Sequence, residues 1–129
     1  MCRPEDVELL LPLGGHGVVV HCISGWDRTP LFISLVRLWL WADGLVHESL
    51  RVDEVIFLTV ATDWMLFGHD FYTRYRQQVE LLLFCFSLLE AAAAFVLNDR
   101  HTDEHLQQRA SRLQALRDTF LGYYHQVDF

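Results

Sequence analysis

Gly17–Thr29 reads GVVVHCISGWDRT, and the order of residue types in this stretch decides what the chain can fold into. Val18–Val20 is a short β-branched run of the kind that favours a strand. A glycine-containing loop follows, with Cys22 at its start and Arg28 at its end. After the loop, apolar residues return at helical spacing. The stretch therefore predicts a strand at 17–22, a tight loop and then the N-terminus of a helix.

This order suits the binding of a phosphate dianion beneath a cysteine thiolate. Backbone N–H groups of residues 23–28 can turn inward as a concave nest, and the helix that follows points its partial positive end at the same place. Gly25 permits backbone angles that a side chain disfavours. The guanidinium of Arg28 can bind two phosphate oxygens at once. We expect the same positive field to lower the pKa of Cys22 and make it a thiolate at neutral pH.

The expected chemistry is attack of Cys22 on phosphorus, giving a phosphocysteine that water hydrolyses. Asp27 is the only carboxylate inside the loop that can protonate a leaving alkoxide. The hydroxyl of Thr29 has two compatible uses, as a helix cap or as a hydrogen-bond donor to the thiolate. The predicted catalytic residues are Cys22, Asp27 and Arg28, and the predicted substrate-binding residues are Ile23, Ser24, Gly25, Trp26, Arg28 and Thr29.

A structural alternative exists, because a cysteine after a strand is usually just a small core residue. A Cys-x5-Arg spacing alone is also a weak signal. Here, however, His21 precedes the cysteine, a glycine lies inside the loop, and strand and helix patterns flank it. The context therefore favours a phosphatase loop.

Two segments resemble a known family. HCISGWDRT at 21–29 resembles HCSDGWDRT, the signature of the myotubularin-related phosphoinositide 3-phosphatases, and CISGWDRTPLFISL is similar to a divergent branch of that family. WMLFGHDFYTR at 64–74 resembles the family's W-x-x-F-G-H-x-F-x-x-R. The resemblance covers roughly residues 8–97. One departure is Ser24, which stands where the family has an aspartate, so the loop has one carboxylate fewer.

The resemblance implies removal of the 3-phosphate of phosphatidylinositol 3-phosphate and of the 3,5-bisphosphate, without a metal or other cofactor. The partner would be a phosphoinositide lipid at a membrane surface, and the location cytoplasmic and peripheral to endomembranes. Two alternatives stay open. One is a protein tyrosine or dual-specificity phosphatase; the other is a non-catalytic fragment that pairs with an oligomer partner or with a relative that has an intact phosphatase domain.

Composition limits the classes of function. The 129 residues are 52% hydrophobic, which is ample for a core, and the formal charge of −7 excludes a uniformly basic surface for nucleic acid. Three scattered cysteines give neither a disulfide framework nor zinc spacing. His101 and His105 have helical spacing, but no further metal ligands accompany them. A working thiolate implies a reducing setting.

The expected fold class is that of a Cys-based α/β phosphatase, of which this chain would be the mainly α part. We expect one strand followed by about four helices, at 29–42, 52–67, 77–97 and 102–124, with breaks at 68–70 and 98–102. The apolar stretch 77–97 contains Glu90, and the runs on either side are too short to span a membrane. We therefore expect a buried helix with Cys85 in the core. His69 is expected to be a structural residue near the loop.

A single strand cannot satisfy its own backbone groups. We therefore expect the chain to be a C-terminal part of a catalytic domain, with 1–97 as phosphatase domain and 98–129 as a helical segment. The last helix carries Arg109, Arg112 and Arg117 between its leucines. This pattern favours a helix that packs on a neighbour with its charged face in solvent over a membrane-facing basic helix. Alone, the chain is expected to be poorly stable or weakly active.

Overall fold

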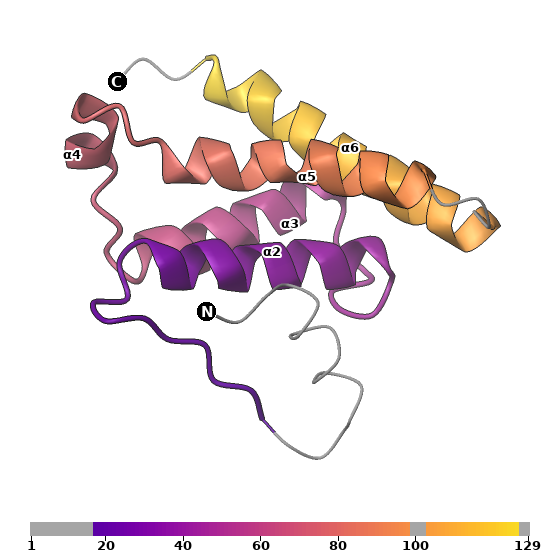
Figure 1. Cartoon of the computed structure of the whole chain (residues 1–129), viewed down its shortest axis with the longest axis horizontal. Coiled ribbons are helices and arrows are strands. Elements are labelled where there is room, and N and C mark those ends of the chain that lie inside the picture. The colour runs from indigo at the N-terminus through magenta and orange to yellow at the C-terminus, as the bar shows by residue number, and fades with distance from the viewer. Residues whose placement is uncertain (1–16, 99–102, 127–129) are drawn as a thin grey trace.

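The computed structural model describes residues 17–98 and 103–126 of the chain. The elements are α2 (Arg28–Ala42), α3 (Val52–Thr59), the π-helical segment η2 (Val60–Met65), α4 (Phe71–Arg76), α5 (Leu81–Leu97) and α6 (Glu104–Tyr124). Figure 1 shows α5 and α6 lying side by side above α2 and α3, with the short α4 at one end. The prediction of a mainly helical chain is confirmed. None of the described helices is both long enough and apolar enough to cross a membrane.

The predicted strand at 17–22 is wrong. These residues are neither helix nor strand, and Figure 1 shows the start of the described chain trailing away from the helices. A strand exists only when its backbone groups pair with another strand, and the described ranges contain no strand that could serve. Val19 is accordingly 84% exposed.

Two of the predicted helices differ most from the expectation. The helix predicted at 52–67 is divided into α3 and η2, and the one predicted at 77–97 begins only at Leu81. The hydroxyls of Thr59 and Thr62 donate to carbonyls four residues earlier, at 2.7 and 2.6 Å, at the point where the helix changes type. Such back-bonding competes with the regular backbone bonds and helps a helix depart from α geometry.

The short helix α4 was not predicted. Its six residues are too few to display an apolar period. Asp70 caps it by accepting a hydrogen bond from the Thr73 N–H at 3.0 Å, and that bond is the main cause of the lowered pKa of Asp70. Gln78, with φ of 58°, ends the turn that follows.

The densest core lies between α5 and α6. The rings of Phe86 and Phe120 stack with centroids 3.9 Å apart, and Leu113 and Leu116 are fully buried beside them. Cys85 is also fully buried, as predicted, and burial raises the pKa of its thiol.

The arginines of α6 bind neighbouring elements. Arg109 forms an ion pair with Asp43 at the end of α2, and its guanidinium lies 5.0 Å from the Trp39 ring. Arg112 donates to the Trp41 carbonyl oxygen at 3.3 Å. Arg117 pairs with Glu90 of α5 at 3.1 Å. The packing of α6 on its neighbours is therefore confirmed, but its arginines do not form the expected solvated face, because all three contact α2 or α5.

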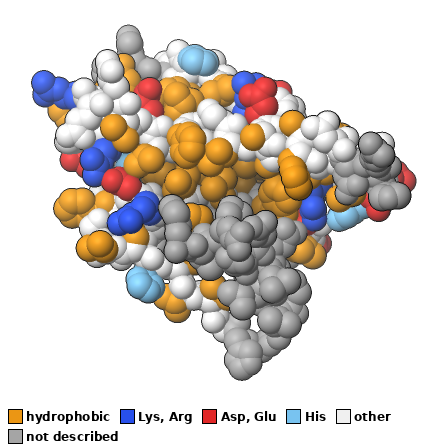
Figure 2. Space-filling model, in the orientation of Figure 1, with side chains coloured by type: hydrophobic (Ala, Val, Ile, Leu, Met, Phe, Trp, Pro, Cys, Tyr) orange, Lys and Arg blue, Asp and Glu red, His pale blue; other side chains and the backbone are white. Residues whose placement is uncertain are grey.

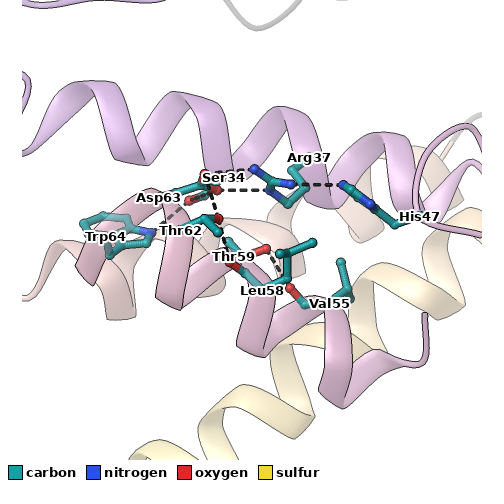
Figure 3. A network of polar contacts seen from close by, with 9 residues as sticks. All are labelled: Ser34, Arg37, His47, Val55, Leu58, Thr59, Thr62, Asp63 and Trp64. Atoms are coloured by element: carbon teal, nitrogen blue, oxygen red, sulfur yellow. Dashed lines mark hydrogen bonds and ion pairs between the residues drawn. The ribbon is translucent and has the colours of Figure 1, made fainter. Parts of the chain in front are cut away.

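A buried carboxylate joins α2 to η2 (Figure 3). Asp63, whose side chain is 2% exposed, accepts two hydrogen bonds from the Arg37 guanidinium, at 2.9 and 3.1 Å, and one from the Ser34 hydroxyl at 3.3 Å. The Trp64 indole N–H donates to the same Ser34 hydroxyl at 2.8 Å. Arg37 Nη1 also lies 3.0 Å from His47 Nε2, within hydrogen-bond distance. The network fixes η2 against α2.

Part of the apolar surface stays open. Figure 2 shows hydrophobic side chains gathered over the middle of one face, with charged groups around them. A groove of about 980 Å³ runs between α3, η2, α4, α5 and the C-terminal part of α6. His69 and Arg74 line it, whereas no residue of the Cys22 loop does.

Replacing Phe86 by alanine should lower the free energy of unfolding by about 3–5 kcal/mol, because the substitution leaves a cavity against Phe120. Phe95→Ala on the same helix is the matched control, since that side chain is 79% exposed and its loss should change stability by less than about 0.5 kcal/mol. Urea denaturation followed by circular dichroism measures both. Equal losses in the two variants would show that the α5–α6 core is not packed as described.

Replacing Arg37 by methionine should cost about 3–5 kcal/mol, because it leaves the Asp63 charge buried without its cation. The double variant Arg37→Met/Asp63→Asn should recover part of that loss. Arg51→Met is the control, because Arg51 pairs with Asp53 at the surface, where water screens the pair. Urea denaturation followed by circular dichroism measures the stability of all three variants. An Arg37→Met variant as stable as Arg51→Met would contradict the role given to the network.

Candidate active site

The sulfur of Cys22 lies between two donors of the loop that precedes α2. The Thr29 hydroxyl donates to Sγ at 3.0 Å, and the Gly25 N–H donates to it at 3.2 Å. Gly25 has a φ of 74°, in the left-handed region that favours glycine. That backbone angle allows the loop to turn back so that the amide faces the sulfur. Of the amides expected to turn inward, the Gly25 N–H faces the sulfur.

These donors lower the pKa of Cys22 from its ordinary 9.0 to about 7. The hydrogen bond from the Thr29 hydroxyl is the largest cause, desolvation of the sulfur opposes it, and the backbone of Thr29, Gly25 and Ser24 adds to the lowering. About half of the sulfur is therefore thiolate at neutral pH. Cys85, the other cysteine in the described ranges, is buried and its pKa is raised. Cys22 is thus the reactive one of the two.

The structure distinguishes between the two predicted uses of the Thr29 hydroxyl. Helix α2 begins at Arg28 with Asp27 at its N-cap, and the Asp27 side chain makes no capping bond. Thr29 lies inside the first turn, so its use as a plain N-cap is wrong. The predicted hydrogen bond from its hydroxyl to Cys22 is present.

Asp27 is held from the corner between η2 and α4. Arg74 Nη2 lies 2.7 Å from Asp27 Oδ2, and His69 Nδ1 lies 3.2 Å from Oδ1. His69 Nδ1 is closer still to the Trp26 carbonyl oxygen, at 2.8 Å. A carbonyl only accepts, so this nitrogen carries the proton and donates to Trp26. The interpretation of His69 as a structural residue bonded near the loop is confirmed.

The ring of His69 is enclosed by aromatic side chains. Its centroid lies 4.8 Å from those of both Trp64 and Phe71, each in an edge-on arrangement. The residue is 6% exposed. Arg74 was part of the resembled W-x-x-F-G-H-x-F-x-x-R segment but received no role from the sequence; its contact with Asp27 becomes visible only in three dimensions.

The remaining predicted site residues face solvent. Ile23 is 96% exposed and Trp26 57% exposed. Ser24 and Arg28 are exposed as well, and no ion pair within 17–98 and 103–126 involves Arg28. The structure therefore brings Cys22, Gly25 and Thr29 together and ties Asp27 to α4.

The described residues contain no group of three or more His, Cys, Asp or Glu side chains that could hold a metal ion. Of the histidine pair considered in the sequence, His101 lies outside the described ranges. His105 Nε2 is 3.9 Å from the Asp43 carboxylate.

Replacing Thr29 by valine should raise the pKa of Cys22 from about 7 toward 9, because the strongest donor to its sulfur is lost. Less thiolate at neutral pH means slower alkylation by iodoacetamide, by about threefold or more. The pH dependence of alkylation, with the modified peptide identified by mass spectrometry, gives the value. Thr119→Val on α6 removes the same hydroxyl elsewhere and should leave the profile unchanged. A Thr29→Val profile identical to that of the parent chain would refute the assigned hydrogen bond.

Comparison with known proteins agrees with these features. A family model described as myotubularin-like phosphatase domain matches residues 7–119. Human phosphatidylinositol-3,5-bisphosphate 3-phosphatase MTMR14 is 61% identical over 88 residues, which cover 65% of this chain and 14% of the human protein. The mouse protein of the same name is 61% identical over 74 residues, covering 57% of this chain and 11% of that protein.

A more distant relative is Xenopus laevis phosphatidylinositol-3,5-bisphosphate 3-phosphatase MTMR4, 39% identical over 61 residues that cover 47% of this chain and 5% of that protein. The chain thus spans 14% or less of the length of these three relatives. No solved structure matches. Because the family match covers most of the chain and includes the Cys22 loop, the chain belongs to the family with a myotubularin-like phosphatase domain.

Proposed function

We propose that this chain carries the catalytic loop of a phosphoinositide 3-phosphatase, which removes the 3-phosphate of phosphatidylinositol 3-phosphate and of the 3,5-bisphosphate. The observation that carries the proposal is the Cys22 sulfur held between the Thr29 hydroxyl and the Gly25 amide, with a pKa of about 7. The substrate class is supported by the relatives, which are named as 3-phosphatases of phosphatidylinositol 3,5-bisphosphate.

In the first step, the Cys22 thiolate attacks phosphorus, so that an S–P bond forms while the P–O bond to the inositol ring breaks. Asp27 gives its proton to the departing inositol oxygen. The loop amides and Arg28 hold the phosphoryl oxygens, over which charge is spread in the transition state.

In the second step, water attacks the phosphocysteine and gives a proton to Asp27. The S–P bond breaks, inorganic phosphate leaves and the thiolate returns. The Thr29 hydroxyl stabilises the departing sulfur, because it already donates to Sγ at 3.0 Å. In the second step Asp27 therefore regains the proton that it gives in the first.

A membrane lipid is supported as substrate by the apolar rim of the loop. Ile23 and Trp26 expose 96% and 57% of their surfaces beside Cys22. Exposed apolar side chains next to a site are typical of interaction with a membrane or a protein. We place the chain at the cytoplasmic surface of endomembranes, bound peripherally.

Cys22→Ser should abolish phosphate release from vesicles containing phosphatidylinositol 3-phosphate, because the nucleophile is lost. Asp27→Asn should slow it by about 10²–10⁴-fold, the usual contribution of a general acid. Malachite-green detection of phosphate measures both, with a phosphotyrosine peptide as second substrate. Ser87→Ala removes an exposed hydroxyl on α5 and should retain activity.

The alternatives give different results. Hydrolysis of the peptide without the lipid would identify a tyrosine phosphatase. The third outcome is a folded chain that releases phosphate from neither the lipid nor the peptide but coelutes with a myotubularin that has a complete phosphatase domain. That result would identify a non-catalytic interaction fragment. The open apolar groove favours this second alternative over the first.

A further inference from the structure

Among the residues that the structure describes, no strand pairs with the segment leading into the Cys22 loop to hold its shape. Residues 17–22 are irregular, and Asp27 makes no capping bond to α2. Yet the two donors to the sulfur, on Gly25 and Thr29, must keep their direction if they are to lower its pKa. Trp26 and Asp27 lie between these donors in the chain. Whatever holds that dipeptide also holds the donors on either side of it.

The dipeptide is held by contacts from residues more than forty positions away. Arg74 reaches the Asp27 carboxylate at 2.7 Å, and both side chains are partly withdrawn from water, at 31% and 27% exposure. His69 donates to the backbone oxygen of Trp26 at 2.8 Å. One contact therefore restrains a side chain and the other restrains the backbone, so the dipeptide is fixed in both position and orientation.

The two contacts come from a rigid support. The His69 side chain is 1% exposed and packs edge-on against Trp64, whose indole N–H is bonded to Ser34 of α2. Arg74 belongs to α4, which Asp70 caps directly after His69. The loop is thereby tied through this corner to the helix that it precedes.

We propose that Arg74 and His69 are positioning residues of the Cys22 loop, which hold Trp26 and Asp27 and so aim the Gly25 amide and the Thr29 hydroxyl at the sulfur. The proposal deepens the proposed function, because the same two contacts orient the carboxyl that serves as acid and base. Neither residue needs to touch the substrate for this role.

The test measures the pKa of Cys22 in the full chain from the pH dependence of iodoacetamide alkylation. Arg74→Met should raise that pKa and slow alkylation at neutral pH by about threefold or more. Arg74→Lys keeps a cation on the same helix and should restore part of the rate. Arg76→Met is the matched control, since Arg76 lies on the exposed side of α4 over the Tyr72 ring and should not change the profile.

Asp27→Asn separates positioning from a simple charge effect. Removing a nearby negative charge acts by itself to lower the pKa of a thiol. Positioning predicts the opposite sign, because a loosened loop no longer aims its donors at the sulfur. Circular dichroism confirms that each variant is folded. A lowered pKa in Asp27→Asn, or an unchanged profile in folded Arg74→Met, would overturn the proposal.

His69→Leu probes the backbone contact and should also raise the Cys22 pKa. Because His69 is buried, this variant can lose its fold. The test of the positioning role then rests on Asp27→Asn, since Asp27 belongs to the same cluster and is partly exposed. Alkylation of Cys22 does not require the chain to hydrolyse a substrate, so failure of the positioning role can be distinguished from failure of the proposed function. A response of the Cys22 pKa without phosphoinositide hydrolysis refutes the proposed function alone, and hydrolysis with unresponsive alkylation refutes the positioning role alone.

Discussion

The ion pair between Asp63 and Arg37 is the constraint on which the geometry of the site depends. A carboxylate with 2% of its side chain exposed is tolerated only where donors surround it, and apart from the neighbouring Thr62 hydroxyl those donors come from α2. The pair therefore fixes η2 at one position along α2. Trp64 follows Asp63 in the chain and shares Ser34 with it, so its indole is placed by the same network. The ring of Trp64 then positions His69.

Helix α2 connects the site to the rest of the core. Its N-terminal turn supplies Thr29 to the Cys22 sulfur, and its C-terminal end is fastened to α6 by Asp43 and Arg109. Between these ends, the Asp63 network binds it to η2 (Figure 3). A helix restrained at its C-terminal end and in the middle is a firm base for a loop beneath which the described residues form no strand. The net charge of −7 does not oppose anion binding there, because the field of amide and hydroxyl donors is local.

The sequence predicted the features that follow from neighbouring residues. The donor role of Thr29, the left-handed Gly25 and the buried positions of Cys85, Leu113 and Leu116 follow from loop chemistry or from helical period, and all are present. The strand at 17–22 failed because a β-type run is only a strand when another segment pairs with it. Helix α4 was missed because six residues show no period, although the Asp70 cap was a usable signal. The division of the chain at residue 97 and its weak stability stay predictions.

By itself, the sequence determined which residue types meet around the sulfur, because Cys22, Gly25 and Thr29 lie within one short loop whose own turn brings them together. It also determined the family, through the loop and the segment that contains His69 and Arg74. Only the tertiary structure decided that Arg74 holds Asp27 and that His69 holds Trp26. Trp26 and His69 are 43 positions apart in the chain. Local spacing carries no information on such a contact, since it arises from the way η2 packs against α2 and turns the chain back toward the loop.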